Sequence, residues 1–141
     1  MAVNVYFEDV NVGDEVPAWS RQTDFMNWNR YAAVNDEFVP IHMDDEAGRE
    51  AGFPTAIAMG NLAFAYLHNM LRAWLNEGGE IRKIGVQYRQ PAIRKTTVAA
   101  RGKITGVNKT AEGSEVELEL WVDDDSGRVL VNGSATVLVR A

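Results

Sequence analysis

The stretch that decides the fold is residues 60–76, GNLAFAYLHNMLRAWLN, in which apolar side chains point to nearly every side of a helix. A helix with this pattern is normally buried inside its protein. Gly78 and Gly79 follow it, and glycine is the residue best suited to the left-handed backbone at a helix end. At 1.5 Å per residue the helix is about 25 Å long, so the rest of the chain must cover a long apolar surface.

Four predicted strands after this helix supply the covering surface. Residues 114–122 give the clearest pattern, because valine and leucine alternate with glutamate and so place one face of the strand in a core. Turn-forming residues at 108–113 and 123–127 separate neighbouring strands. The expected strands are residues 80–90, 96–107, 114–122 and 129–140. We predict an α+β fold in which the long helix lies across the apolar face of an antiparallel meander.

The part of the chain before residue 60 is predicted to supply one strand and two short helices. Residues 16–21 form the strand, and a helix with apolar residues at three-to-four spacing follows Thr23 and Asp24, which can cap it. Pro40 prevents the regular continuation of that helix. Residues 35–42, NDEFVPIH, are therefore predicted as a loop, rich in groups that titrate, before a second short helix over residues 44–52.

Composition excludes several kinds of chemistry. The chain has 141 residues and 15.6 kDa, which fits one domain over residues 1–141. It has no cysteine, so it cannot form disulfides, thiolate nucleophiles or cysteine-ligated metal clusters. Only two histidines are present, which leaves little room for a histidine-rich metal site. The net charge of −6 argues against nucleic acid as the main partner, because phosphate binding needs a basic surface.

Targeting and membrane signals are not visible in the sequence. The first residues, MAVNVYFEDVNVGDEV, show no basic region followed by an apolar run, so we expect no signal peptide. The most apolar stretch, residues 56–75, is interrupted by polar side chains, whereas a spanning helix needs about 20 mostly apolar residues. We expect a soluble, cytoplasmic protein that does not enter a membrane.

Residues 31–62, YAAVNDEFVPIHMDDEAGREAGFPTAIAMGNL, resemble the hydratase signature of the MaoC-like enzymes, the (R)-specific enoyl-CoA hydratases and related dehydratases. The eighteen-residue interval from His42 to Gly60 also resembles the family's. Weaker similarities are Tyr88 to Pro91, which resembles the motif F-R-x-P, and the opening Phe7-Glu8-Asp9 with Val12-Gly13-Asp14. The resemblance implies the hot-dog fold, a long helix wrapped by an antiparallel sheet. It also implies hydration of a 2-enoyl-CoA, or dehydration of a 3-hydroxyacyl thioester, without metal or redox cofactor.

The same resemblance implies the catalytic residues. Counted back from His42 without a gap, the family's catalytic aspartate falls on Glu37 and its asparagine on Val39; with one extra loop residue, Asp36 takes the aspartate's place. We favour Glu37 and keep Asp36 as the alternative. A carboxylate and a histidine on one loop can share the two proton transfers of hydration. Gly60, at the start of the long helix, would donate its backbone N–H to the thioester oxygen, where the helix dipole favours negative charge.

Further residues are candidates for contact with the acyl-CoA substrate. His68 corresponds to a serine of the family and Met59 to a histidine, although the simpler interpretation of both is a place in the core. Arg94 and Lys95 replace a Gly-Asp pair of the family and are candidates for binding coenzyme A phosphates, although solvated strand ends explain them more simply. The full set of candidates is Asn35, Met59, Asn61, His68, Arg94 and Lys95.

Two other functions fit the same fold. A thioesterase would place a carboxylate near the long central helix, and Glu77 at its far end is a poor substitute. A non-catalytic or half-site subunit, which completes the site of a related chain, is suggested by the altered aspartate and the missing asparagine. By analogy with single hot-dog domains we expect a homodimer, or a hetero-oligomer with a related hot-dog chain.

Overall fold

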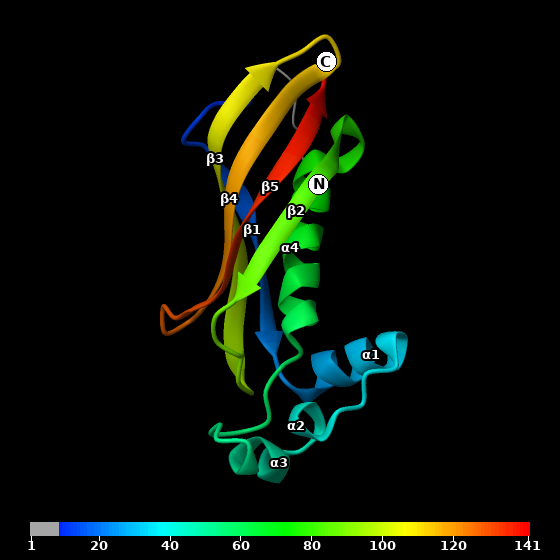
Figure 1. Cartoon of the computed structure of the whole chain (residues 1–141), viewed down its shortest axis with the longest axis vertical. Coiled ribbons are helices and arrows are strands. Elements are labelled where there is room, and N and C mark those ends of the chain that lie inside the picture. The colour runs from blue at the N-terminus through cyan, green and yellow to red at the C-terminus, as the bar shows by residue number, and fades with distance from the viewer. Residues whose placement is uncertain (1–8) are drawn as a thin grey trace.

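The computed structural model describes residues 9–141, in which a long helix lies across a five-stranded sheet and three shorter helices gather at one end (Figure 1). The predicted α+β arrangement is confirmed. The strands are β1 (Glu15–Thr23), β2 (Gly79–Tyr88), β3 (Thr96–Lys109), β4 (Gly113–Asp124) and β5 (Val129–Arg140). The helices are α1 (Phe25–Asn35), α2 (Pro40–Met43), α3 (Asp45–Glu50), α4 (Gly60–Leu75) and the 3₁₀ turn η2 (Asn76–Gly78). Phe7 and Glu8 of the opening motif lie outside the described residues.

The strand order differs from the predicted meander. The order across the sheet is β1-β3-β4-β5-β2, with every neighbouring pair antiparallel. The turns at 108–113 and 123–127 do join neighbours, but β2 pairs with β5 and not with β3. The link after β2 crosses the end of the sheet from β5 to β1. At its start Arg89 N–H donates to the carbonyl of Leu130 in β5, and at its end Lys95 N–H donates to the carbonyl of Thr23 in β1.

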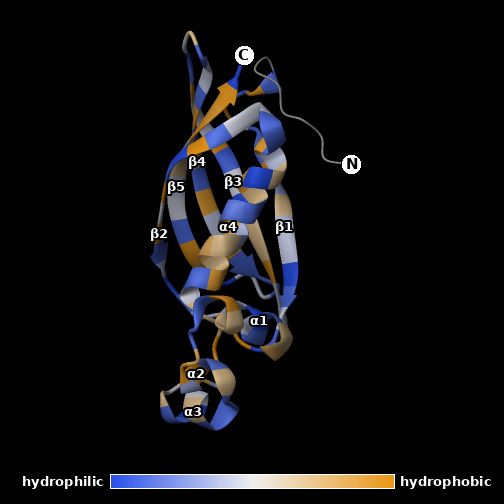
Figure 2. Ribbon diagram, turned by 90° about the vertical axis from the view of Figure 1, so that its right-hand side faces the viewer, coloured by the Kyte–Doolittle hydropathy of each residue, from blue (hydrophilic) through white to orange (hydrophobic). Residues whose placement is uncertain are grey.

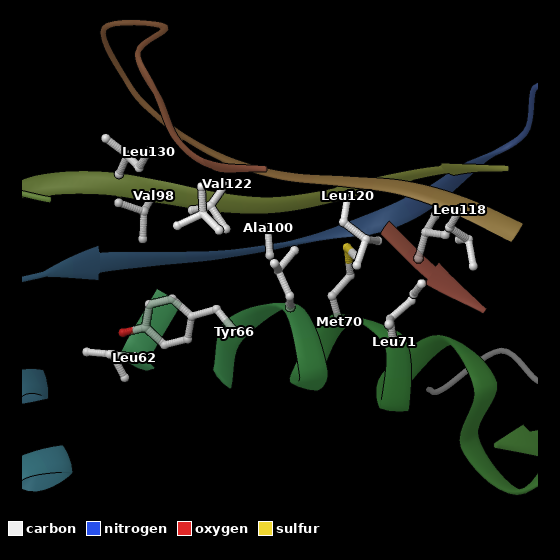
Figure 3. Close-up of a cluster of buried hydrophobic side chains, with 14 of the residues drawn as sticks. Leu62, Tyr66, Met70, Leu71, Val98, Ala100, Leu118, Leu120, Val122 and Leu130 are labelled. Atoms are coloured by element: carbon white, nitrogen blue, oxygen red, sulfur yellow. The ribbon is translucent and has the colours of Figure 1, made fainter. Parts of the chain in front are cut away.

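The core lies between α4 and the concave face of the sheet. Tyr66, Met70 and Leu71 of α4 point toward the strands, where they meet side chains such as Leu118 and Leu120 of β4 (Figure 3). All five side chains are at most 7% exposed. Burying a large apolar side chain contributes roughly 1.5–3 kcal/mol to folding.

Helix α4 is covered on one side only, which corrects the prediction of a helix buried all round. Asn61, Asn69 and Arg72 are exposed, and Phe64 and His68 are half-buried on the same outward side. Figure 2 shows this side of α4 in front of the sheet, between β2 and β1. None of the helices within residues 9–141 combines the length and the apolar character needed to cross a membrane.

Residues 35–42 are not a loop throughout, because Pro40 begins α2. The proline ring fixes φ near the helical value, and proline has no N–H to lose at a first helical position. Helix α1 already ends at Asn35 with the left-handed C-cap Asp36, and Pro40 is instead the start of the helix that carries His42. Helices α1, α2 and α3 lie together below the sheet, beside the first turn of α4 (Figure 1).

Candidate active site

His42 is held in one orientation by the main chain. Its side chain lies on α2, the residue is 9% exposed, and ring Nδ1 lies 2.7 Å from the carbonyl oxygen of Ile57. A carbonyl oxygen only accepts hydrogen bonds, so Nδ1 must carry the proton and the neutral ring keeps Nε2 as an acceptor. Ile57 is fixed in turn, because its own N–H donates to the carbonyl of Ile41, one residue before His42. The imidazole is thus positioned as a base with a free Nε2 lone pair.

His42 lines a hollow of about 300 Å³ whose walls are mostly apolar. The first residue of α4, Gly60, lies in the same hollow as His42, so the structure brings these two predicted residues together. The other lining residues come from the segment before α4, from α4 itself, from β2 and the link after it, and from β5. They include Phe53, Ile57, Met59, Ala63, Tyr88, Leu130 and Val131.

The N-terminus of α4 has free backbone donors at this hollow. Its N-cap residue, Met59, makes no side-chain hydrogen bond to the first turn. The first N–H groups of a helix have no partner within the helix, and the dipole makes this end favourable for negative charge. The arrangement can therefore stabilise an oxyanion close to His42.

Tyr88 is a site residue that the sequence interpretation missed. Its ring covers Gly60 so closely that a Cβ added there would lie 3.3 Å from two ring carbons. Its hydroxyl donates to Oδ1 of Asn61 at 2.7 Å. The sequence did contain a signal for it: Tyr88 stands where the motif F-R-x-P has phenylalanine, and tyrosine carries a hydroxyl that phenylalanine lacks.

The two candidate carboxylates lie in a second hollow, of about 560 Å³, beside the first. Asp36 ends α1 with a left-handed backbone, φ 55°, and Glu37 follows it with its N–H bonded to Ala32. His42 does not line this hollow, but Asn61 does, so the Tyr88–Asn61 hydrogen bond lies where the two hollows meet.

Glu37 is the carboxylate whose charge reaches this boundary. Burial raises the pKa of Tyr88 above its ordinary value, and the negative charge of Glu37 raises it further. The pKa of Tyr31 is raised by the same two causes, burial first and then Glu37. Asp36 has no such effect on either tyrosine.

Three of the six expected substrate contacts line these hollows. Asn35 and Asn61 line the carboxylate hollow, and Met59, only 1% exposed, lines the wall beside His42. His68 faces the outward side of α4, edge-on to Phe64 at a centroid distance of 4.7 Å. It lines neither hollow, so the structure does not bring it to His42 or to the carboxylates.

Arg94, a candidate for binding coenzyme A phosphates, is not a free cation in the structure. Its guanidinium is 2.7 Å from Asp24 Oδ1 and 2.6 Å from Asp45 Oδ2, and it lies over the ring of Phe25. Lys95, next to it, is exposed with a left-handed backbone. Between residues 9 and 141, no group of three or more histidine, aspartate or glutamate side chains gathers as a metal site.

Residues 10–125 match the sequence model of the family described as MaoC like domain. The chain belongs to the MaoC-like domain family. The resemblance seen in residues 31–62 is therefore confirmed. No curated protein matches this MaoC-like chain at the sequence level.

Solved structures give the same fold at low identity. The R-hydratase PhaJ1 from Pseudomonas aeruginosa superposes with a TM-score of 0.86 at 17% identity, over 97% of this chain and 86% of that one. An (R)-hydratase from A. caviae involved in PHA biosynthesis gives 0.84 at 20% identity, over 94% and 98%. A chain of the ChsH1–ChsH2 complex from Mycobacterium tuberculosis gives 0.80 at 18% identity, over 92% and 98%. The MaoC-like chain thus has the predicted hot-dog fold.

Proposed function

We propose that this MaoC-like chain hydrates a 2-enoyl-CoA, or runs the reverse dehydration of a 3-hydroxyacyl thioester. The observation that carries the proposal is His42: a buried imidazole, fixed through Nδ1, in an apolar hollow that also contains the free N-terminus of α4. An acyl chain suits the apolar walls, and a thioester oxygen suits the helix N-terminus.

The reaction adds OH to C3 of the enoyl group and H to C2. When water attacks C3, negative charge develops on the thioester oxygen, to which the N–H of Gly60 would donate a hydrogen bond; removing such a donor typically costs about 2.7–4 kcal/mol. One member of the pair Glu37 and His42 takes a proton from the water, and the pair then returns this proton to C2 of the enolate, so both groups end in their starting states. The hollows of Glu37 and His42 meet at the Tyr88–Asn61 hydrogen bond, so an enoyl group bound across this boundary would have a proton-transfer group in each hollow.

A second hot-dog chain is proposed to cover the outward side of α4. Two hollows of about 550 and 660 Å³ follow this side and share His68 and Arg72, and the outer edge of the neighbouring strand β2 is unpaired within residues 9–141. An uncovered edge strand is a ready template for pairing with another chain. The partner is a second copy or a related chain, and light scattering of the purified protein distinguishes a dimer from a monomer that needs a different partner.

The deciding experiment incubates the purified protein with crotonyl-CoA and, separately, with butyryl-CoA. We expect loss of the conjugated-thioester absorbance from the first and no free thiol from the second. Thiol release would indicate a thioesterase, and silence with both would indicate a subunit that needs a catalytic partner. Glu77, the carboxylate that a thioesterase reading would use, lies beyond the far end of α4 from Gly60.

Substitution of the site residues tests the mechanism. His42→Ala should lower kcat about 10²–10⁴-fold, the usual contribution of general acid–base catalysis. Glu37→Gln should cause a loss of the same order, whereas Asp36→Asn should stay within a few-fold of wild type. Full activity in His42→Ala would contradict the proposed function, and a loss in Asp36→Asn alone would transfer the carboxylate role to Asp36.

A further inference from the structure

We propose that Arg94 is a positioning residue that keeps His42 in its catalytic tautomer and orientation. This proposal rests on the proposed function, because only that function makes the orientation of His42 a catalytic one. The link itself is structural and can be tested in the absence of any substrate. It replaces the expected contact of Arg94 with coenzyme A phosphates.

Arg94 ties the link after β2 to two of the short helices. Its Nε donates to Asp24, the N-cap of α1, at 2.7 Å, and its Nη1 donates to Asp45, the first residue of α3, at 2.6 Å. The guanidinium carbon lies 4.0 Å from the ring centroid of Phe25, the first residue of α1. The Arg94 side chain is only 23% exposed, so these contacts are partly shielded from solvent. Charge-assisted bonds in this setting are stronger than those of a solvated pair.

The second carboxylate oxygen of Asp45 continues the connection toward His42. Oδ1 of Asp45 accepts the N–H of Ala56 at 3.0 Å, while Oδ2 is held by Arg94. Ala56 directly precedes Ile57, whose carbonyl oxygen fixes Nδ1 of the imidazole. A continuous series of contacts thus runs from Arg94 through Asp45 and the backbone of residues 56–57 to His42.

The same backbone segment is also held by the neighbours of Arg94. Ile57 forms a β-bridge with Ile93, and Ala58 N–H donates to the carbonyl of Ala92 at 2.9 Å. Residues 56–58 are therefore held both by Asp45 and by residues 92–93. Arg94 bonds directly to Asp45 and is covalently joined to Ile93, so it fixes the spacing between Asp45 and residues 92–93.

Arginine is the side chain that this arrangement requires. Its planar guanidinium presents separate N–H donors to two carboxylates at once, whereas lysine offers a compact point charge. Without the cation, Asp24 and Asp45 would face each other as unneutralised negative charges at a partly buried position. We expect Asp45 then to turn toward solvent and to release Ala56, which would loosen the carbonyl that orients His42.

The first test observes the imidazole itself by ¹⁵N NMR. In the wild-type protein the two ring nitrogens of His42 should give the separated shifts of a fixed Nδ1–H tautomer. In Arg94→Met they should move toward a common averaged value, and in Arg94→Lys only part of that movement should remain. Arg101→Met is the matched control, because Arg101 pairs with Asp123 between β3 and β4, and neither residue contacts α1, α2 or α3 through that pair. An unchanged His42 spectrum in Arg94→Met would overturn the proposal whether or not the protein is a hydratase.

The two carboxylates provide variants that separate positioning from folding. Asp45→Asn weakens the bond to Arg94 and should reproduce the change at His42. Asp24→Asn keeps an oxygen that can cap α1 and lies off the path to His42, so it should have the smaller effect. An equal change of the His42 spectrum in Asp45→Asn and Asp24→Asn, or no change in either variant, would contradict the path through Asp45. If Arg94→Met does not fold, Arg94→Lys with these two variants decides the question.

Kinetics give the second test. Loss of orientation should lower kcat of hydration with little change in KM, and a misplacement of about 1 Å can cost on the order of 10²-fold. It should also shift the pH profile of kcat, which a general loss of folded protein would not do. A raised KM for crotonyl-CoA with an unchanged His42 spectrum would instead support a phosphate contact and overturn the positioning role.

Discussion

At the scale of single residues, the position of Glu37 can be tested through its two tyrosine neighbours. Burial raises the pKa of Tyr31 and of Tyr88, and the charge of Glu37 adds to both shifts. Glu37→Gln should therefore lower the two pKa values toward 10.0, while Asp36→Asn should leave them unchanged. Tyr66, whose pKa is raised by burial without Glu37, serves as the internal control.

The measurement is a pH titration of ¹³Cζ-labelled tyrosine, followed over the range in which the native spectrum persists. It needs no substrate, so it locates the carboxylate independently of activity. A shift of Tyr88 in Asp36→Asn, with none in Glu37→Gln, would show that Asp36 is the carboxylate beside Gly60.

The backbone of Lys95 has an unfavourable conformation that its side chain does not explain. Its φ is 59°, a left-handed value that costs a residue with a Cβ roughly 1–2 kcal/mol, and its N–H is bonded to Thr23 in that conformation. Lys95→Gly should raise the free energy of unfolding in urea by about 1 kcal/mol. Lys95→Ala removes the same charge without relieving the backbone and should give no gain. Equal changes in the two variants would mean that charge, and not φ, decides the effect.

At the scale of elements, the close contact between β2 and β5 at Gly133 leaves no room for a side chain. A Cβ on Gly133 would lie 2.0 Å from the carbonyl oxygen of Gly85 and 2.8 Å from the Cα of Val86. Gly133→Ala must therefore separate the two strands, and we expect a loss of about 1–3 kcal/mol or more in the free energy of unfolding. Gly85→Ala is the matched control, since a Cβ there meets nothing within 4 Å, and it should stay within about 0.5 kcal/mol.

Urea unfolding gives the two free energies, and amide exchange shows where the loss occurs. Faster exchange in Gly133→Ala should be concentrated in β2, because β2 is an edge strand with β5 as its one partner in the sheet. Equal stability of the two variants would mean that the strands shift apart without cost.

The elements were predictable where the signal is local. The alternation along β4 and the cap at Asp24 place a strand and the start of α1 correctly, since both signals lie within a few residues. Helix α2 was missed because a proline can stop a helix or begin one, and the residue type alone does not distinguish these roles; here Pro40 begins α2. The burial of α4 was overestimated because an apolar sequence does not say which of the helix's sides the sheet covers.

At the scale of the whole molecule, the missing information is long-range pairing. His42 and Gly60 were found from a short spacing, and the fold brings them to one hollow. Tyr88 reaches Asn61 across 27 residues and Arg94 reaches Asp45 across 49, and no local pattern encodes such contacts. The position of β2 beside β5 was unpredictable for the same reason, because turn residues specify only neighbouring strands.

The acid stability of the whole chain should depend on three aspartates. Hydrogen bonding to Arg94 lowers the pKa of Asp24, and the Ala56 N–H together with Arg94 lowers that of Asp45. Burial opposes the same shift at Asp124, but hydrogen bonds from Ser126 and Arg128 exceed it and lower the pKa. Each folded pKa lies below the unfolded value of 3.8, so the stabilisation is present above about pH 4 and is lost as the pH falls through the folded values.

The variant Arg94→Met separates the effect of the Arg94 charge on acid stability from the effect of its packing. Without the guanidinium, the pKa values of Asp24 and Asp45 should return toward 3.8, so the variant binds fewer extra protons when it unfolds in acid. Its free energy of unfolding should therefore fall less steeply below pH 4 than that of the wild type, and the gap between the two proteins should narrow from pH 7 to pH 3. Urea unfolding at a series of pH values measures this gap. A gap that stays constant with pH would mean that Arg94 stabilises the fold by packing on Phe25, because a contact of that kind does not change when the aspartates are protonated.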